Sequence, residues 1–121
     1  MAFLFAENTP FEWPVTVCVP NGGTHDEIVI TGHFAMIDDE EFFEADPDIT
    51  ARSAGIEAEI AKLMKVFKGW GEGDLLDANK NPVPPTPENI RRFLGQRPAR
   101  LGVTEAYATA ITPTKGFRAK N

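Results

Sequence analysis

The amino-acid sequence predicts an α+β protein in which an N-terminal antiparallel β-hairpin or small sheet is followed by three to four helices. Apolar residues alternate from Val15 to Val19 and again between Ile28 and Met36, as in half-buried strands. After residue 48 the apolar residues instead recur at helical spacing. Clusters of proline and glycine separate these segments and mark the turns between them.

The length of 121 residues predicts a single domain. We expect residues 1–37 to be mainly β, residues 38–112 to be mainly α with a long loop over 69–85, and residues 113–121 to form a mobile tail. The single cysteine, Cys18, excludes an internal disulfide and favours a reducing compartment. No apolar run approaches the roughly 18 residues of a membrane span, and the first residues lack the basic start of a signal peptide. We therefore expect a cytoplasmic protein with no membrane partner.

The first two strands are predicted to form a hairpin. Pro14 is expected at the start of the first strand, where a missing N–H costs little. Between the strands, residues 20–26 contain a proline that ends the first strand and an Asn-Gly pair suited to a turn. We expect this loop to be longer than two residues. In the second strand, the residues expected on one face are Ile28, Ile30, Phe34 and Met36.

Helices are predicted next. The acidic run over residues 38–44 suits the first turn of a short helix, which Pro47 interrupts. Asp48 or Thr50 can then cap a longer helix that ends at Gly69 and Gly71. Its buried stripe is expected to contain Ile49, Ile56, Ile60, Leu63, Met64 and Phe67.

The last third of the chain has clear helix signals after a long loop. Glycine, proline, asparagine and aspartate dominate residues 69–85 and make regular structure improbable there. Thr86 then serves as an N-cap, Pro87 as the first helical residue and Gly95 as the stop of a short helix. Pro98 opens a final helix that is expected to run to about Thr112.

Charge is distributed unevenly along the chain. Residues 1–60 hold 13 Asp and Glu against one basic residue, Arg52, whereas residues 61–121 hold five against 11 Lys and Arg, which gives the net charge of −6. This acidic balance disfavours nucleic acid as a partner, although four arginines cluster over residues 91–100. The two halves are expected to attract each other within the fold, to support self-association between copies, or to be solvated faces.

The residues that could carry catalysis are few. The chain has one serine, one cysteine, one tyrosine and two histidines, and no nucleophile–base pattern joins them. The acidic run at 38–44 lacks the spacing of a calcium loop, and the glycines of residues 69–73 are not followed by the lysine of a phosphate-binding loop. We therefore expect no enzymatic activity, no cofactor and no metal site.

Exposed aromatic and leucine side chains are the candidates for partner binding. The aromatic residues of the first 13 positions either cover the sheet or anchor a partner chain. In the loop, the indole of Trp70 either packs on the helices, which we favour, or binds a partner. The candidate partner-binding residues are Phe3, Phe5, Phe11, Trp13, Trp70, Leu75 and Leu76.

The second half of the chain contains a recognisable set of segments, namely Val66–Trp70, Asn81–Ile90, Phe93–Leu94, Pro98, Ala106–Tyr107 and Lys120–Asn121. This set resembles the tail assembly chaperones of long-tailed bacteriophages and prophages. The resemblance extends over residues 28–121, with the Thr31–Met36 segment and the acidic residues after it matching the N-terminal half of the family. The Gly71–Asp77 stretch is longer and richer in leucine than the family's usual turn.

The resemblance implies a non-catalytic chaperone that binds the phage tape-measure protein in the cytoplasm of the bacterial host during tail morphogenesis. It carries over no catalytic residues. A long helical client with exposed apolar stripes needs transient cover, which many copies of a small acidic protein could provide. The alternative is a small structural component of the virion, such as a tail-tube or connector protein.

Overall fold

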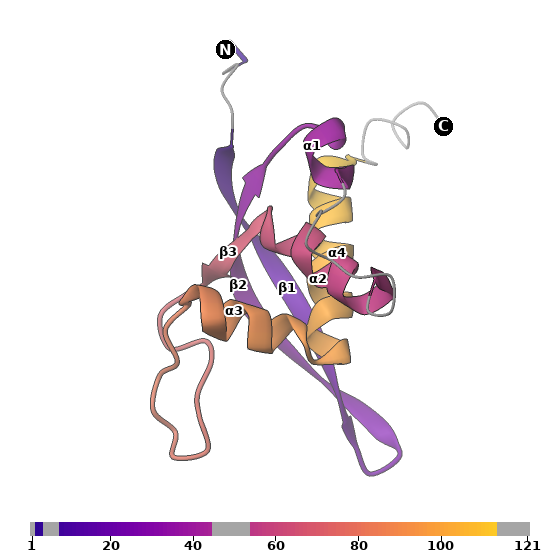
Figure 1. The fold of residues 1–121 in the computed structure, drawn as a ribbon. Coiled ribbons are helices and arrows are strands. Elements are labelled where there is room, and N and C mark those ends of the chain that lie inside the picture. The colour runs from indigo at the N-terminus through magenta and orange to yellow at the C-terminus, as the bar shows by residue number, and fades with distance from the viewer. Residues whose placement is uncertain (1, 4–7, 45–53, 114–121) are drawn as a thin grey trace, which may run out of the picture.

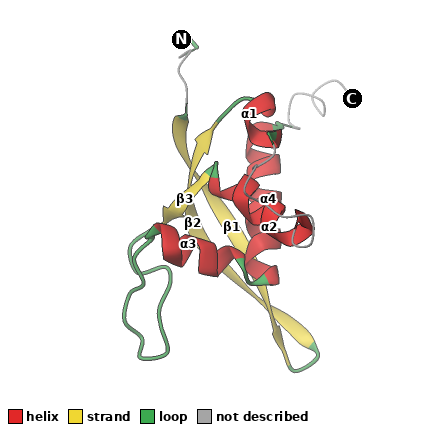
Figure 2. Ribbon diagram, viewed as in Figure 1, coloured by secondary structure: helices red, strands yellow, loops and turns green. Residues whose placement is uncertain are grey.

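The computed structural model describes residues 2–3, 8–44 and 54–113 and confirms the α+β fold class (Figure 1). Three antiparallel strands form one sheet in the order β1-β2-β3, and helices cover one of its faces (Figure 2). The predicted capping residues Asp48 and Thr50, and the tail over 114–121, lie outside the described residues. The elements are β1 (Thr9–Asn21), β2 (Thr24–Met36), α1 (Asp39–Phe43), α2 (Ala54–Met64), β3 (Phe67–Trp70), α3 (Pro87–Leu94) and α4 (Arg97–Ile111).

The β1–β2 hairpin is longer and more tightly closed than expected. Asn21 pairs with Thr24, so the turn contains only Gly22 and Gly23, with φ values of 57° and 89°. Both central residues of such a two-residue turn need positive φ, which glycine adopts without strain. The expectation of a longer loop is therefore wrong, because strand pairing continues up to these glycines.

The tip of this hairpin extends beyond the helices (Figure 1). Of the four residues expected on the buried face of β2, Ile30 and Phe34 are buried, whereas Ile28 and Met36 are 49% and 37% exposed. The alternation correctly predicted the strand. The alternation did not predict how much of β2 the helices cover.

Three prolines lie along β1 at alternate positions. Pairs in an antiparallel ladder alternate between those that exchange both hydrogen bonds and those that exchange none. Pro10, Pro14 and Pro20 belong to the same alternating set, and proline has no N–H to donate. The backbone of that set therefore faces away from β2, at the outer edge of the sheet. The prediction that Pro14 starts the first strand is wrong, because β1 already begins at Thr9.

The helix predicted to extend through Phe67 instead ends at Met64, and this prediction is wrong. Residues 67–70 form β3, which pairs with β2 through Gly32–Trp70 and Phe34–Phe67 and bulges between these pairs. The buried side chains of Ile60 and Leu63 confirm part of the predicted stripe, whereas Ile56 is 53% exposed. Apolar residues three or four positions apart are compatible with a continuing helix and also with a helix that ends and turns into a short strand. Both arrangements bury the same side chains, so this spacing does not distinguish them.

The predicted start and end of α3 are confirmed. The Thr86 hydroxyl accepts a hydrogen bond from Asn89 N–H at 3.2 Å, Pro87 opens the helix and Gly95 follows its last residue. Helix α4 then crosses β1 at Gly102, where a Cβ atom would lie 2.4 Å from the carbonyl oxygen of Thr16. Only glycine permits this close approach.

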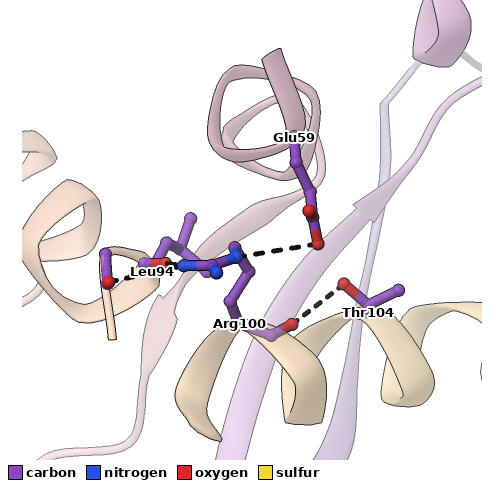
Figure 3. A network of polar contacts seen from close by, with 5 residues as sticks. Glu59, Leu94, Arg100 and Thr104 are labelled. Carbon is purple, nitrogen blue, oxygen red and sulfur yellow. Dashed lines mark hydrogen bonds and ion pairs between the residues drawn. The ribbon is translucent and has the colours of Figure 1, made fainter. Parts of the chain in front are cut away.

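A buried arginine on α4 connects three helices (Figure 3). Arg100 is 5% exposed, and its Nη1 donates hydrogen bonds to the carbonyl oxygens of Leu94, at 3.0 Å, and Gly95, at 3.3 Å. Its Nε lies 3.7 Å from Oε1 of Glu59 on α2. The guanidinium therefore satisfies the carbonyls at the end of α3, which have no partners within the helix.

The hydrophobic core beneath these helices comprises Val15, Val17, Ile30, Phe34, Ile37, Ile60, Leu63, Val66, Phe67, Trp70, Ile90, Leu94, Val103, Ala106 and Tyr107.

Candidate functional site

The aromatic residues predicted near the N-terminus do not form one exposed surface. Phe3 is 78% exposed, while Phe5 lies outside the described residues. Phe11 and Trp13 are half-buried on the helix-facing side of β1 and pack against the core. The Phe11 ring stacks on Phe34 with centroids 5.4 Å apart. Phe11 and Trp13 therefore act mainly as cover for the sheet.

Trp70 is an internal anchor for the loop that follows it. Its side chain is 2% exposed and packs against Phe93 at a centroid distance of 5.3 Å. Its indole Nε1 donates a 2.8 Å hydrogen bond to the carbonyl oxygen of Val83. Leu75 is half-buried against the core, and Leu76 is 54% exposed. Burial thus removes Trp70 from the candidate partner surface and leaves Leu76 as its exposed member in this loop.

A hollow on the helical side is an apolar groove of about 770 Å³ between α1, α2 and α4, here called the α1–α2–α4 groove. Aromatic side chains from α1 and α4 and small or aliphatic side chains from α2 and α4 supply most of its lining. Its size and apolar character suit the side chains of a bound helix or a small apolar ligand. The apolar lining residues are Phe42, Phe43, Gly55, Ala58, Ala61, Leu63, Tyr107, Ala108 and Ile111.

Helix α1 forms one wall of the groove and is held by few contacts. Asp38 caps it through a 2.8 Å hydrogen bond from Glu41 N–H to its carboxylate. Lys65 Nζ donates to the carbonyl oxygens of Glu41 and Glu44 at 2.9 and 2.7 Å, which ties the end of α1 to the segment after α2. The ring of Phe42 lies 5.2 Å from that of Tyr107 on α4.

The groove combines this apolar floor with charged side chains at its edge. Asp39, Glu44 and Glu59 contribute carboxylates, and the ammonium of Lys62 lies 5.0 Å from the centroid of the Phe43 ring, within cation–π range. Burial raises the pKa of Tyr107 above its ordinary value of 10.0; the hydrogen bond from Ile37 N–H lowers it, and nearby Asp39 adds to the increase. The phenol is therefore neutral at physiological pH.

The groove offers apolar side chains together with carboxylates, two lysines and one phenol. Among the described residues that line it, none is a serine, cysteine or histidine, the side chains on which nucleophilic and acid–base sites most often depend. The described part of the chain also contains no cluster of three or more histidine, cysteine, aspartate or glutamate side chains that could hold a metal ion. No helix within residues 2–3, 8–44 and 54–113 is long and apolar enough to cross a membrane.

Sequence reasoning missed this groove because its lining comes from three elements that are distant along the chain. Phe42 and Phe43 lie in an acidic run that predicts the start of a short helix, and this pattern does not indicate that both rings line a groove. On α4, Tyr107, Ala108 and Ile111 share one side of the helix, a spacing that could have indicated an apolar face beyond the core. The juxtaposition with α1 and α2 is a property of the fold.

Comparisons were made with models of protein families, with curated proteins and with solved structures, and the chain matches none of them.

Proposed function

We propose that this protein is a non-catalytic tail assembly chaperone of a bacteriophage or prophage, which binds the tape-measure protein in the host cytoplasm during tail morphogenesis. The observation that carries the proposal is the α1–α2–α4 groove, an apolar surface whose charged lining residues are three carboxylates and two lysines. A helix with an apolar stripe flanked by charged residues is complementary to it. The tape-measure protein is the helical client that the family resemblance implies.

The residues that carry the resemblance also support this role, because several of them build the groove or the helix that forms it. Ala106 and Tyr107, the Ala-Tyr pair of the final helix, are 6% and 3% exposed on α4. Tyr107 reaches the groove lining, where it packs against Phe42 of α1. The Thr86 cap fixes the start of α3, and Arg100 joins α3 to α4. Residues that carry the resemblance thus contribute to the platform on which α4 presents its apolar face.

The groove can be tested with two substitutions at neighbouring exposed positions of α4. Ala108 lines the groove, whereas Thr109 faces a shallow hollow on the other side of the helix, beside β1. Ala108→Arg should fill the groove and weaken binding of a helical tape-measure segment by at least about tenfold, or 1.4 kcal/mol. Thr109→Arg, the matched control, should bind as the wild type does. Titration calorimetry with overlapping tape-measure segments measures both affinities.

Two results would contradict the proposal. The first is equal binding by the wild type and Ala108→Arg. The second is the presence of the protein in purified virions at a fixed ratio to the tail subunits, which would favour a structural component of the tail tube or connector. A chaperone should be absent from finished particles and should be captured with the tape-measure protein when the two are co-expressed.

A further inference from the structure

The two ends of α4 carry opposite charge. The helix has 15 residues and is therefore about 22 Å long. Its first turn follows α3, where the exposed Arg91, Arg92 and Arg97 form what we call the basic pole. Its last turn lies beside α1, since Ile111 lines the same groove as Phe43. Figure 1 shows α1 and α3 at opposite ends of the helical layer.

The end beside α1 is the acidic pole, which we define as Asp39, Glu40 and Glu44. All three are exposed, and the described residues 8–44 contain no lysine or arginine. Lys62 and Lys65 approach this pole, but the Lys62 ammonium lies over the Phe42 and Phe43 rings, and Lys65 donates its hydrogen bonds to the backbone carbonyls of Glu41 and Glu44. Within the part of the chain that the structure describes, no carboxylate of the acidic pole and no guanidinium of the basic pole forms an ion pair.

The dipole of α4 increases this separation of charge. A helix has partial positive charge at its N-terminus and partial negative charge at its C-terminus, so acidic residues are favoured in the first turn and basic residues in the last. Helix α4 has no acidic residue in its first turn and no basic residue in its last. Its positive end adjoins the basic pole, and its negative end adjoins the acidic pole. Within one molecule, each end of the helix dipole lies beside side chains of the same sign, which is unfavourable. When the acidic pole of one molecule meets the basic pole of another, charges of opposite sign come together.

We infer that the acidic pole of one copy docks on the basic pole of a second copy, so that the protein associates head to tail through α1 and the α3–α4 corner. Each pole also presents one large exposed apolar side chain: Phe43 beside the acidic pole, 65% exposed, and Leu101 one turn after Arg97, 58% exposed. These two side chains give the contact an apolar centre within a charged surround, the usual arrangement of a protein–protein interface.

A contact of this kind is heterologous, because it joins two different surfaces. Every bound pair leaves one acidic and one basic pole free, and further copies can add until a ring closes or a filament grows. The acidic pole shares Asp39, Phe43 and Glu44 with the α1–α2–α4 groove, so self-association is tested in the absence of any client. It predicts that the protein assembles in the absence of any partner.

The test uses two charge-reversal variants of the full chain. Glu40→Lys/Glu44→Lys reverses the acidic pole, and Arg92→Glu/Arg97→Glu reverses the basic pole. In each pair one substitution opposes the local helix dipole and the other favours it, so we expect both variants to stay folded, which circular dichroism will check. The control, Glu12→Lys/Glu27→Lys, changes the net charge as much as the first variant at exposed sites on the sheet.

Sedimentation velocity should show wild-type and control species larger than a monomer at about 25 mM salt that dissociate at about 500 mM, where the Debye length falls to roughly 4 Å. Each pole variant alone should be monomeric. An equimolar mixture of the two should associate again, because each reversed pole then meets a complementary one. This rescue depends on pole-to-pole contact and does not follow from net charge.

Three results would overturn the inference. The first is a wild-type monomer at every salt concentration. The second is a mixture of the two variants that stays monomeric although both are folded. The third is a wild-type monomer that binds a labelled DNA or RNA duplex and loses that binding in Arg92→Glu/Arg97→Glu, which would assign the basic pole to nucleic acid.

Discussion

Replacing Trp70 tests how the long loop is held to the fold. The indole is 2% exposed and packs against Phe67 and Phe93, so Trp70→Ala should cost about 3–5 kcal/mol of unfolding free energy through lost contacts and a residual cavity. Trp70→Phe keeps most of the apolar contact but leaves the carbonyl oxygen of Val83 without its donor, which should cost about 1–3 kcal/mol.

The matched control is Trp13→Phe, at the other tryptophan of the chain, which is half-buried on β1. We expect it to cost less than about 1 kcal/mol. Urea unfolding followed by far-UV circular dichroism gives all three free energies by linear extrapolation. If the free energy of unfolding of Trp70→Ala lies within about 1 kcal/mol of the wild-type value, the packing argument is refuted. If it loses client binding at unchanged stability, Trp70 is a partner anchor after all.

Three further changes test the helical layer. Arg100→Met removes the donor to the two carbonyls at the end of α3 and should cost about 2–4 kcal/mol in thermal or urea unfolding, whereas Glu59→Gln should cost less than about 1, because that carboxylate is 39% exposed and lies 3.7 Å away. Equal losses would contradict this ranking. Gly102→Ala should destabilise by about 1–3 kcal/mol and the control Gly55→Ala should not, because a Cβ collides only at the first site. The folded-state pKa of Tyr107 is raised above 10.0, so stability should be unaffected by this group below pH 10 and should fall as the pH rises above it. Ultraviolet titration of this single tyrosine, with Tyr107→Phe as the control, would contradict the prediction if the phenol ionises at or below pH 10.

The features that could be predicted from the sequence are those that neighbouring residues determine. The Thr86 cap, the Gly95 stop and the alternation along β1 each depend on residues within one turn or strand, and the structure contains all of them. Strand β3 was missed because it has four residues, one of them glycine, and its pairing with β2 is remote in sequence.

The candidate site was harder to predict for the same reason. Its lining comes from α1, α2 and α4, and no local pattern reports that Phe42 will face Tyr107 across 65 positions of the chain. Trp70 could be assigned from the sequence only as a preference. A tryptophan in a glycine-rich loop can be a partner anchor or an internal support, and we favour the support; in the structure the indole is 2% exposed and donates to the carbonyl oxygen of Val83.

The prolines of β1 have a consequence for the protein while it is still being made. The hairpin is complete once residue 36 has been synthesised, but α4, which packs over β1 at Gly102, follows more than 60 residues later. At a synthesis rate of about 5–20 residues per second, the outer edge of β1 stays without this cover for roughly 3–13 s. On a polysome, neighbouring nascent chains expose the same edge at the same time. Because Pro10, Pro14 and Pro20 remove three N–H donors from that edge, they weaken pairing between two nascent hairpins along it before the helices are made.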